Sequence, residues 1–329
     1  MRIGQAREVA AEWVAGNACE GAFLSGSASW APDDAELAPA SDMDVMVVVD
    51  GARPKLGKFR HKGVLLEVTY LTWDDLPSAE HVLGHYHLAG AFRRDNVLAD
   101  PGGRLRALVA EVAPRWGEGR WVRARCGHAE AGIVAGLDLV PSARPYPMRV
   151  MRWLFAAGVT THVLLTAALR NPTVRLRYPA VREVVDAEFY EELLALQGSA
   201  GLSARQVRGH VAGMAEIFDE AAVADSAAWP FGSDLSPQAR HIAVDGSLEL
   251  VERGLHREAV FWIAATYARG LLILGRESSP GFDALLADLG AGRPEERAPV
   301  VRAFLPRLRQ RAEELISRRD GGVPPPVAA

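Results

Sequence analysis

Hydrophobic residues follow two different patterns along the chain, and the change falls about a third of the way in. Before it, the apolar runs GAFLSGS, MDVMVVVD and VLLEVTYLTW begin at Gly21, Met43 and Val64 and are separated by turn-forming residues. Runs rich in β-branched and aromatic residues predict strands. Residues 5–18 carry apolar positions at helical spacing and predict a leading helix. The first part is therefore expected to be a small α/β or α+β domain.

The later part shows helical periodicity, with apolar residues three and four apart and charges between them. Six segments have this pattern: residues 121–137, 148–170, 190–198, 204–224, 248–274 and 300–319. Short breaks containing Pro, Gly or Asn separate them, so we expect an all-α bundle of five to seven helices. The predicted organisation is α+β, with one domain over residues 1–105, a helical bundle over 106–320 and a disordered tail over 321–329.

Composition and charge narrow the possible functions. The chain has 329 residues, is 49% hydrophobic and carries a formal net charge of −4. This length allows two separate cores, and the net negative charge gives no electrostatic argument for binding nucleic acid. Residues 1–100 hold 15 acids and 9 bases, a net charge of −6 that fits either a cation site or a solvated acidic surface.

The cysteines and the longest apolar run indicate the compartment. Cys19 and Cys126 are too few for a disulfide framework and are expected to be buried thiols. The N-terminus has charges throughout and lacks the apolar core of a signal peptide. The apolar run at residues 154–169 includes two threonines and His162, which favours a buried helix over a membrane span. We therefore expect a cytoplasmic protein with no membrane partner.

A pair of aspartates at the start of the second predicted strand is the first candidate site. Side chains alternate along a strand, so Asp42 and Asp44 should project from one face while Met43 and the following valines face a core. Two neighbouring carboxylates stay ionised together only when a cation lies between them. Hard oxygen ligands favour Mg²⁺. The alternative interpretation is a turn cap followed by an edge-strand charge.

Two further features favour a ligand site. Gly26 and Ser27 end the preceding predicted strand, where a glycine lets backbone N–H groups approach a phosphate and a serine hydroxyl adds a donor. Glu67 is the one charge in the apolar run VLLEVTYL, and burying a lone carboxylate is costly without a partner. A metal ion shared with the aspartates would be that partner, and an exposed edge position is the alternative.

Together, Gly26-Ser27, Asp42-Met43-Asp44 and Glu67 resemble the signature of nucleotidyltransferases of the DNA polymerase β superfamily. The segments SDMDVMVVV and LEVTYL are similar in particular to the aminoglycoside adenylyltransferases. The resemblance covers roughly residues 20–100 and implies a polymerase-β-like domain, a small mixed sheet with helices, followed by an α-helical bundle. This sequence departs from the pattern in having a longer interval between Ser27 and Asp42.

The resemblance also implies a chemistry. Asp42 and Asp44 would bind Mg²⁺, and Glu67 would be either a third metal ligand or the general base. The Gly-Ser turn and Ser41 would hold the triphosphate. The expected reaction moves a nucleoside monophosphate, most simply AMP from ATP, to a hydroxyl group of a small molecule, with an aminoglycoside-like antibiotic as the default acceptor. The alternatives are transfer to RNA or protein, and a non-catalytic nucleotide-binding protein. Either a monomer or a homodimer would fit.

Further polar groups in the first domain have a functional and a structural interpretation. The basic residues before the Glu67 strand could steer a triphosphate, although a solvated hairpin tip is the simpler interpretation; they are Lys55, Lys58, Arg60 and Lys62. His81, His85 and His87 lack a nearby cysteine or conspicuous acid to complete a zinc set. Arg93 or Arg94 could contact a phosphate or form a surface ion pair.

The helical region contributes candidates for binding the acceptor. Arg175 belongs to an arginine cluster that follows a helix-breaking Asn-Pro pair and could contact an anion or the acceptor. Glu258 lies beside an aromatic, apolar helix face, and Trp262 is one helical turn further on. For Trp262, core packing is the alternative to an acceptor contact.

Overall fold

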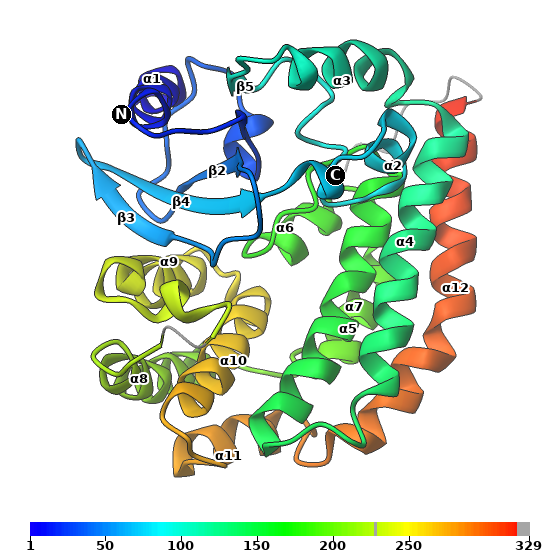
Figure 1. Ribbon diagram of the computed structural model, residues 1–329. Helices are drawn as coiled ribbons and strands as arrows, with labels where there is room; N and C mark the ends of the chain where they lie inside the picture. Colours follow the sequence, from blue (N-terminus) through cyan, green and yellow to red (C-terminus); the bar gives the residue numbers. More distant parts are fainter. Residues whose placement is uncertain (227–228, 321–329) are drawn as a thin grey trace. The chain divides into compact units, whose positions relative to one another are not determined.

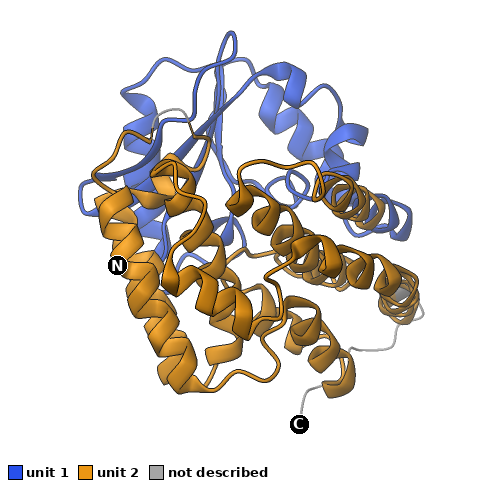
Figure 2. Ribbon diagram, turned by 90° about the horizontal axis from the view of Figure 1, so that it is seen from below, with its two compact units in different colours: residues 1–125 blue, residues 126–329 orange. Residues whose placement is uncertain are grey.

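The computed structural model describes residues 1–226 and 229–320, and the chain divides into two compact units, residues 1–125 and residues from Cys126 onward (Figure 1 and Figure 2). The division falls inside helix α4 (Gly119–Asp138) and thus later than the predicted boundary after residue 105. The helix α3 (Arg104–Val112) belongs to the first unit because Leu105 and Val112 are buried in its core. The predicted disordered tail, residues 321–329, lies outside the described residues.

The first unit is built on a mixed five-stranded sheet with the strand order β3-β4-β2-β1-β5. The strands are β1 (Gly21–Leu24), β2 (Met43–Val48), β3 (Gly57–His61), β4 (Val64–Leu71) and β5 (Val97–Ala99). β2 and β4 are parallel, whereas the other neighbouring pairs are antiparallel. The predicted α+β class, with a small mixed sheet in the N-terminal part and mostly helices after it, is confirmed.

The β3-β4 hairpin adds a strand, β3, that the sequence did not predict, within the basic segment before the Glu67 strand. His61 pairs with Val64, so the connecting loop has the two residues Lys62 and Gly63, whose φ angles are 47° and 85°. Positive φ at both central positions is characteristic of the type I′ turn, whose twist matches that of the strands it joins. Phe59 anchors the new strand because its ring packs against Trp13 of the first helix, α1 (Ile3–Ala15), with the ring centroids 5.4 Å apart.

Two sets of helices cover the two faces of this sheet. Ala6 and Ala10 of α1 (Ile3–Ala15) are fully buried in one hydrophobic cluster with Val45 of β2. The helices α2 (Ala79–Gly84) and α3 pack into a second cluster that contains Val48 of the same strand. Because side chains alternate along β2, the two clusters lie on opposite faces of the sheet.

The second unit is helical. Its helices are α5 (Tyr146–Ala167), α6 (Arg177–Arg182), α7 (Ala187–Gln197), α8 (Ala204–Ala221), α9 (Gly246–Glu252), α10 (His256–Ile273), α11 (Pro280–Asp288) and α12 (Pro294–Asp320). One predicted helix, residues 248–274, is in fact two, α9 and α10. The chain breaks between them at Gly254, which has a φ of 77° that does not occur within a right-handed helix. The short helices α6 and α11 were not predicted.

The helix α5 contains all but the last two residues of the long apolar run at residues 154–169. Among the described residues it is the one helix long and apolar enough to cross a membrane, and 83% of its most apolar window is buried inside the protein. Trp153, Leu154 and His162 are each almost completely buried. The prediction of a buried helix is confirmed. The compartment in which the protein works stays a prediction.

Candidate metal and nucleotide site

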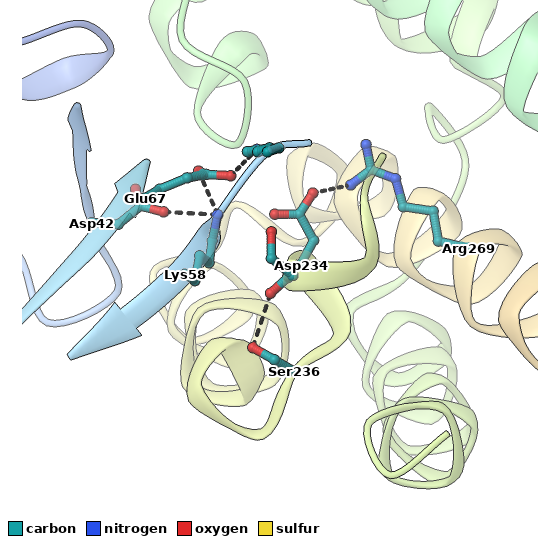
Figure 3. A network of polar contacts seen from close by, with 8 residues as sticks. Asp42, Lys58, Glu67, Asp234, Ser236 and Arg269 are labelled. Carbon is teal, nitrogen blue, oxygen red and sulfur yellow. Dashed lines mark hydrogen bonds and ion pairs between the residues drawn. The ribbon is translucent and has the colours of Figure 1, made fainter. Parts of the chain in front are cut away.

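Three neighbouring strands place charged residues in one row across the sheet. Glu67 of β4 pairs with Asp44 of β2 on one side and with Lys58 of β3 on the other. Residues paired in this way project from the same face, and Asp42 joins them because it lies two residues before Asp44. Figure 3 shows the Lys58 ammonium directed at the carboxylates of Asp42 and Glu67.

The three predicted acids come together at this end of the sheet. Asp42, Asp44 and Glu67 each offer a carboxylate oxygen, and these oxygens lie within 4.8 Å of one another. Among the described residues, this is the one group of three or more His, Cys, Asp or Glu side chains close enough to share a metal ion. Three carboxylate oxygens are ligands suited to a hard cation such as Mg²⁺.

The register of β2 fixes which face the aspartates take. Met43, Val45 and Val47 are buried in the cluster that contains α1, as the sequence pattern predicts. A slip of one residue would turn these side chains away from the core and bury Asp44 in their place. Hydrophobic burial on one face therefore holds the carboxylates on the other.

Gly26 lies directly against the carboxylate of Asp44. A Cβ atom built on Gly26 would be 1.8 Å from Asp44 Oδ2, far inside any van der Waals contact. The backbone at Gly26 has φ 54° and ψ −154°, a region that is essentially restricted to glycine. The Ser25 N–H donates to the Asp44 carbonyl at 2.9 Å and ties the same two segments together. The Gly-Ser turn and the first acids therefore form one local structure.

Two lysines neutralise Glu67. Lys58 Nζ lies 3.0 Å from Asp42 Oδ2 and also pairs with Glu67 Oε2, and its side chain is only 6% exposed. Lys55 pairs with the other oxygen, Glu67 Oε1. The interpretation of this segment as a solvated hairpin tip is wrong for Lys58, which is buried among the acids. It holds for Lys62, whose side chain is 56% exposed and pairs with Glu12.

The pKa values of the acids respond to this uneven charge distribution. Burial raises the pKa of Asp44 well above its usual value, and the nearby charges of Asp42 and Glu67 raise it further. Burial would also raise the pKa of Glu67, but Lys58 and Lys55 outweigh it and lower that pKa to about 2. Asp44 is therefore the acid whose negative charge is least compensated by the protein itself.

The other residues predicted to bind nucleotide lie in loops near these strands. Ser27 is exposed and begins a short 3₁₀ turn, Ser27–Ser29. The Ser29 hydroxyl donates to the Gly26 carbonyl at 2.8 Å, which fixes the turn. Ser41 immediately precedes Asp42 and is partly exposed, and its N–H donates to the Ala38 carbonyl. The hydroxyls of Ser27 and Ser41 thus belong to the two segments that meet at Gly26 and Asp44.

Arg93 and Arg94 anchor the loop that follows the Gly-Ser turn. Arg94 donates to the carbonyls of Ser29 and Ala31, at 2.9 and 2.6 Å. Arg93 donates to the carbonyl of Trp30 at 3.1 Å and lies over its ring. These contacts replace the predicted surface ion pair and give both arginines a structural role in holding the turn.

The three histidines considered as zinc ligands, His81, His85 and His87, lie next to one another with their rings in contact. The rings of His81 and His85 have centroids 5.8 Å apart, and those of His85 and His87 are 5.9 Å apart. Tyr86 packs on His87 with a centroid distance of 3.8 Å. Their neighbours in this segment are thus aromatic rings.

The acceptor candidates lie in the second unit. Glu258 is 3% exposed, and its Oε1 accepts a hydrogen bond of 2.6 Å from the Tyr190 hydroxyl. Arg175 donates to the Gly246 carbonyl at 3.1 Å. Trp262 is partly exposed, and the guanidinium of Arg269 lies 5.3 Å from its ring. Arg269 pairs with Asp234 (Figure 3). The roles of Glu258 and Arg175 in binding an acceptor stay predictions.

The chain was also compared with known proteins. No protein-family model, no curated protein and no solved structure matches it. What the site can do is therefore argued from its own residues and from the sequence resemblance.

Proposed function

We propose that this protein is a Mg²⁺-dependent nucleotidyltransferase that moves a nucleoside monophosphate, most simply AMP from ATP, to a hydroxyl group of a small molecule. The observation that carries the proposal is the group of three carboxylates with oxygens within 4.8 Å, set against a glycine turn. The resemblance of the same residues to the DNA polymerase β superfamily supports it. That superfamily's fold for the first unit is part of the proposal.

The donor set suits a divalent cation. Asp42, Asp44 and Glu67 would hold Mg²⁺, which takes oxygen ligands and binds through carboxylates together with substrate phosphates. When bound, the ion would neutralise phosphate charge and stabilise the entering and leaving oxygens of the transfer. Asp44 fits this role because its own surroundings raise the pKa and leave its charge poorly compensated.

Glu67 is better suited to holding a cation than to accepting a proton. A general base works best when its pKa lies near the working pH. While Lys58 and Lys55 are paired with it, the pKa of Glu67 is held at about 2 against the effect of burial, and in this arrangement its carboxylate has little tendency to take a proton from a hydroxyl group. Of the two roles left open by the sequence, we therefore assign Glu67 to cation binding.

The Gly26 turn would receive the nucleotide phosphates. Without a side chain at Gly26, backbone N–H groups can approach an anion closely, and the exposed Ser27 hydroxyl adds a donor. Because the chain would do little covalent work in such a transfer, the rate would depend on positioning and on charge stabilisation. By analogy with the aminoglycoside adenylyltransferases, the acceptor would be an aminoglycoside-like compound.

One observation favours the second candidate, a non-catalytic nucleotide-binding protein. Lys58 already places a positive charge between Asp42 and Glu67, as a metal ion would. In a protein that no longer binds a metal ion, the Lys58 charge could offset the repulsion between the carboxylates. Binding and turnover experiments separate the two functions.

The test is calorimetric titration of Mg²⁺ with each nucleoside triphosphate, followed by pyrophosphate release in an acceptor screen. Asp42→Asn and Asp44→Asn should each abolish Mg²⁺-dependent binding. Asp50→Asn is the matched control because Asp50 is an exposed acid just beyond the same strand. Binding that persists in both site variants would place the nucleotide elsewhere. Tight binding without pyrophosphate release for any acceptor would favour the non-catalytic protein.

A further inference from the structure

The cation position between Asp42 and Glu67 is already filled by a side chain. Lys58 Nζ is 3.0 Å from Asp42 Oδ2 and pairs with Glu67 Oε2. The Lys58 side chain is 6% exposed, whereas those of Lys55 and Lys62 are 29% and 56% exposed. Figure 3 shows that the ammonium bridges the two carboxylates. Of these lysines, Lys58 is thus the one held inside the acidic group.

An ammonium and a divalent ion compete for these oxygens. Mg²⁺ binds carboxylate oxygens at about 2.0–2.1 Å and demands near-octahedral geometry around itself. An ammonium that stays within hydrogen-bond distance of the same oxygens would lie beside the ion, and the two positive charges would repel strongly in a partly buried site. Lys58 must therefore leave before a metal ion can bind Asp42 and Glu67 together.

The local structure allows that movement. β3 is an edge strand, so Lys58 has a strand neighbour on only one side. Its four-carbon stem is flexible, and the ammonium can exchange one oxygen partner for another. Lys55 pairs with Glu67 Oε1, so Glu67 keeps one positive partner when Lys58 leaves.

We propose that Lys58 occupies the cation site until a metal-nucleotide complex arrives, and that its ammonium then moves to a phosphate oxygen of that nucleotide. This inference rests on the proposed function and adds that the metal ion enters the site together with the nucleotide and not alone. Free metal ions are held off by the Lys58 charge. A metal-nucleotide complex is accepted because it brings both the replacement cation and a new anionic partner for the lysine.

Lys58→Met should therefore change two affinities in opposite directions. Titrated with Mn²⁺ alone and followed by electron paramagnetic resonance, the variant should bind the ion at least about tenfold more tightly than wild type, because one nearby positive charge is gone. With Mg²⁺ and ATP together, it should bind more weakly than wild type. Lys58→Arg keeps the charge and should not tighten Mn²⁺ binding. Lys62→Met, an exposed lysine of the same hairpin, is the control and should change neither affinity.

The outcomes separate this inference from the proposed function. If wild type binds Mg²⁺ with ATP but Lys58→Met does not tighten Mn²⁺ binding, the lysine does not compete with metal and the inference is wrong while the function stands. If neither protein binds metal, with or without nucleotide, both fail. Should Lys58→Met unfold, the thermal midpoint of Lys58→Gln is measured with increasing Mn²⁺. A larger rise than in wild type supports the inference, and an equal rise overturns it.

Discussion

Replacing Gly26 by alanine tests whether the glycine turn and the metal-binding acids are one structure. The new Cβ would lie 1.8 Å from Asp44 Oδ2 and 2.7 Å from its Cγ. Since carbon and oxygen atoms that are not bonded stay more than about 3 Å apart, the carboxylate has to retreat by more than about 1 Å. The backbone conformation adds a strain of about 1–3 kcal/mol, because alanine does not adopt it readily.

The expected result is a loss of both stability and binding. A displacement of about 1 Å in a positioning group can lower activity by about a hundredfold, and we expect a loss of this order in the affinity for Mg²⁺ with ATP. Unfolding in urea measures the free energy of unfolding, and calorimetry measures the affinity for Mg²⁺ with ATP. Gly51→Ala is the matched control, because Gly51 also has a positive φ, 78°, but a Cβ there meets nothing within 4 Å. It should lose stability only.

A double-mutant cycle isolates the contact itself. In an Asp44→Ala background there is no carboxylate for the new methyl group to displace, so Gly26→Ala should cost less free energy than it does in wild type. Equal costs in the two backgrounds would show that the clash with Asp44 is not the cause. Wild-type affinity for Mg²⁺ with ATP in Gly26→Ala would refute the reasoning about the site as a whole.

Two further predictions concern Asp44 and the buried acid Glu258. Asp44→Asn should stabilise the metal-free protein at neutral pH, by on the order of 1 kcal/mol, because burial and then the charges of Asp42 and Glu67 raise the pKa of Asp44 in the folded state. The gain in stability should be absent below about pH 4, where the unfolded carboxyl is also protonated, and should grow as the pH rises through the window between the unfolded and folded pKa values. Urea unfolding at several pH values measures the gain. A gain that is already full at pH 3 would show that the raised pKa of Asp44 is not its cause. Tyr190→Phe should lower the free energy of unfolding by about 1–3 kcal/mol, because Glu258 loses its hydroxyl donor inside the helical unit. Urea unfolding of Tyr190→Phe/Glu258→Gln should show a smaller loss of stability. Equal losses in the two variants would mean that the hydrogen bond between Tyr190 and Glu258 contributes little.

The acidic group could be predicted from sequence because strand alternation is a short-range rule. Once Met43 and Val45 are assigned to the core, Asp42 and Asp44 must share the other face. That Glu67 joins them depends on the parallel pairing of β2 with β4, which the sequence did not predict; Glu67 was singled out as the one charge in an apolar run, and the family resemblance implied the same role. The three oxygens within 4.8 Å are what that resemblance implied, although the activity remains a proposal.

The buried position of Lys58 on a strand was not predicted because the sequence signal for that strand is weak. A type I′ hairpin is usually marked by Asn-Gly or Asp-Gly, whereas this turn is Lys62-Gly63. The residues before this turn, 57–61, include Lys58 and Arg60 and only one large apolar side chain, Phe59, so the segment resembles a solvated loop. The break at Gly254 was overlooked for a similar reason, since a single glycine within a helical pattern is often tolerated. In both places, the backbone angle of one or two residues decides the structure.

The β3-β4 hairpin also bears on how the first unit folds. Its two-residue turn joins strands that are adjacent in sequence, so this pairing closes a very short loop and is expected to form early. The parallel pairing of β2 with β4 is more distant and brings Asp44 beside Glu67, which opposes it through like-charge repulsion. Because the hairpin sets Lys58 opposite Glu67, β4 carries its compensating charge before β2 docks. With Lys58 in place, the pairing of β2 with β4 is therefore expected to meet a lower electrostatic barrier than two bare carboxylates would impose.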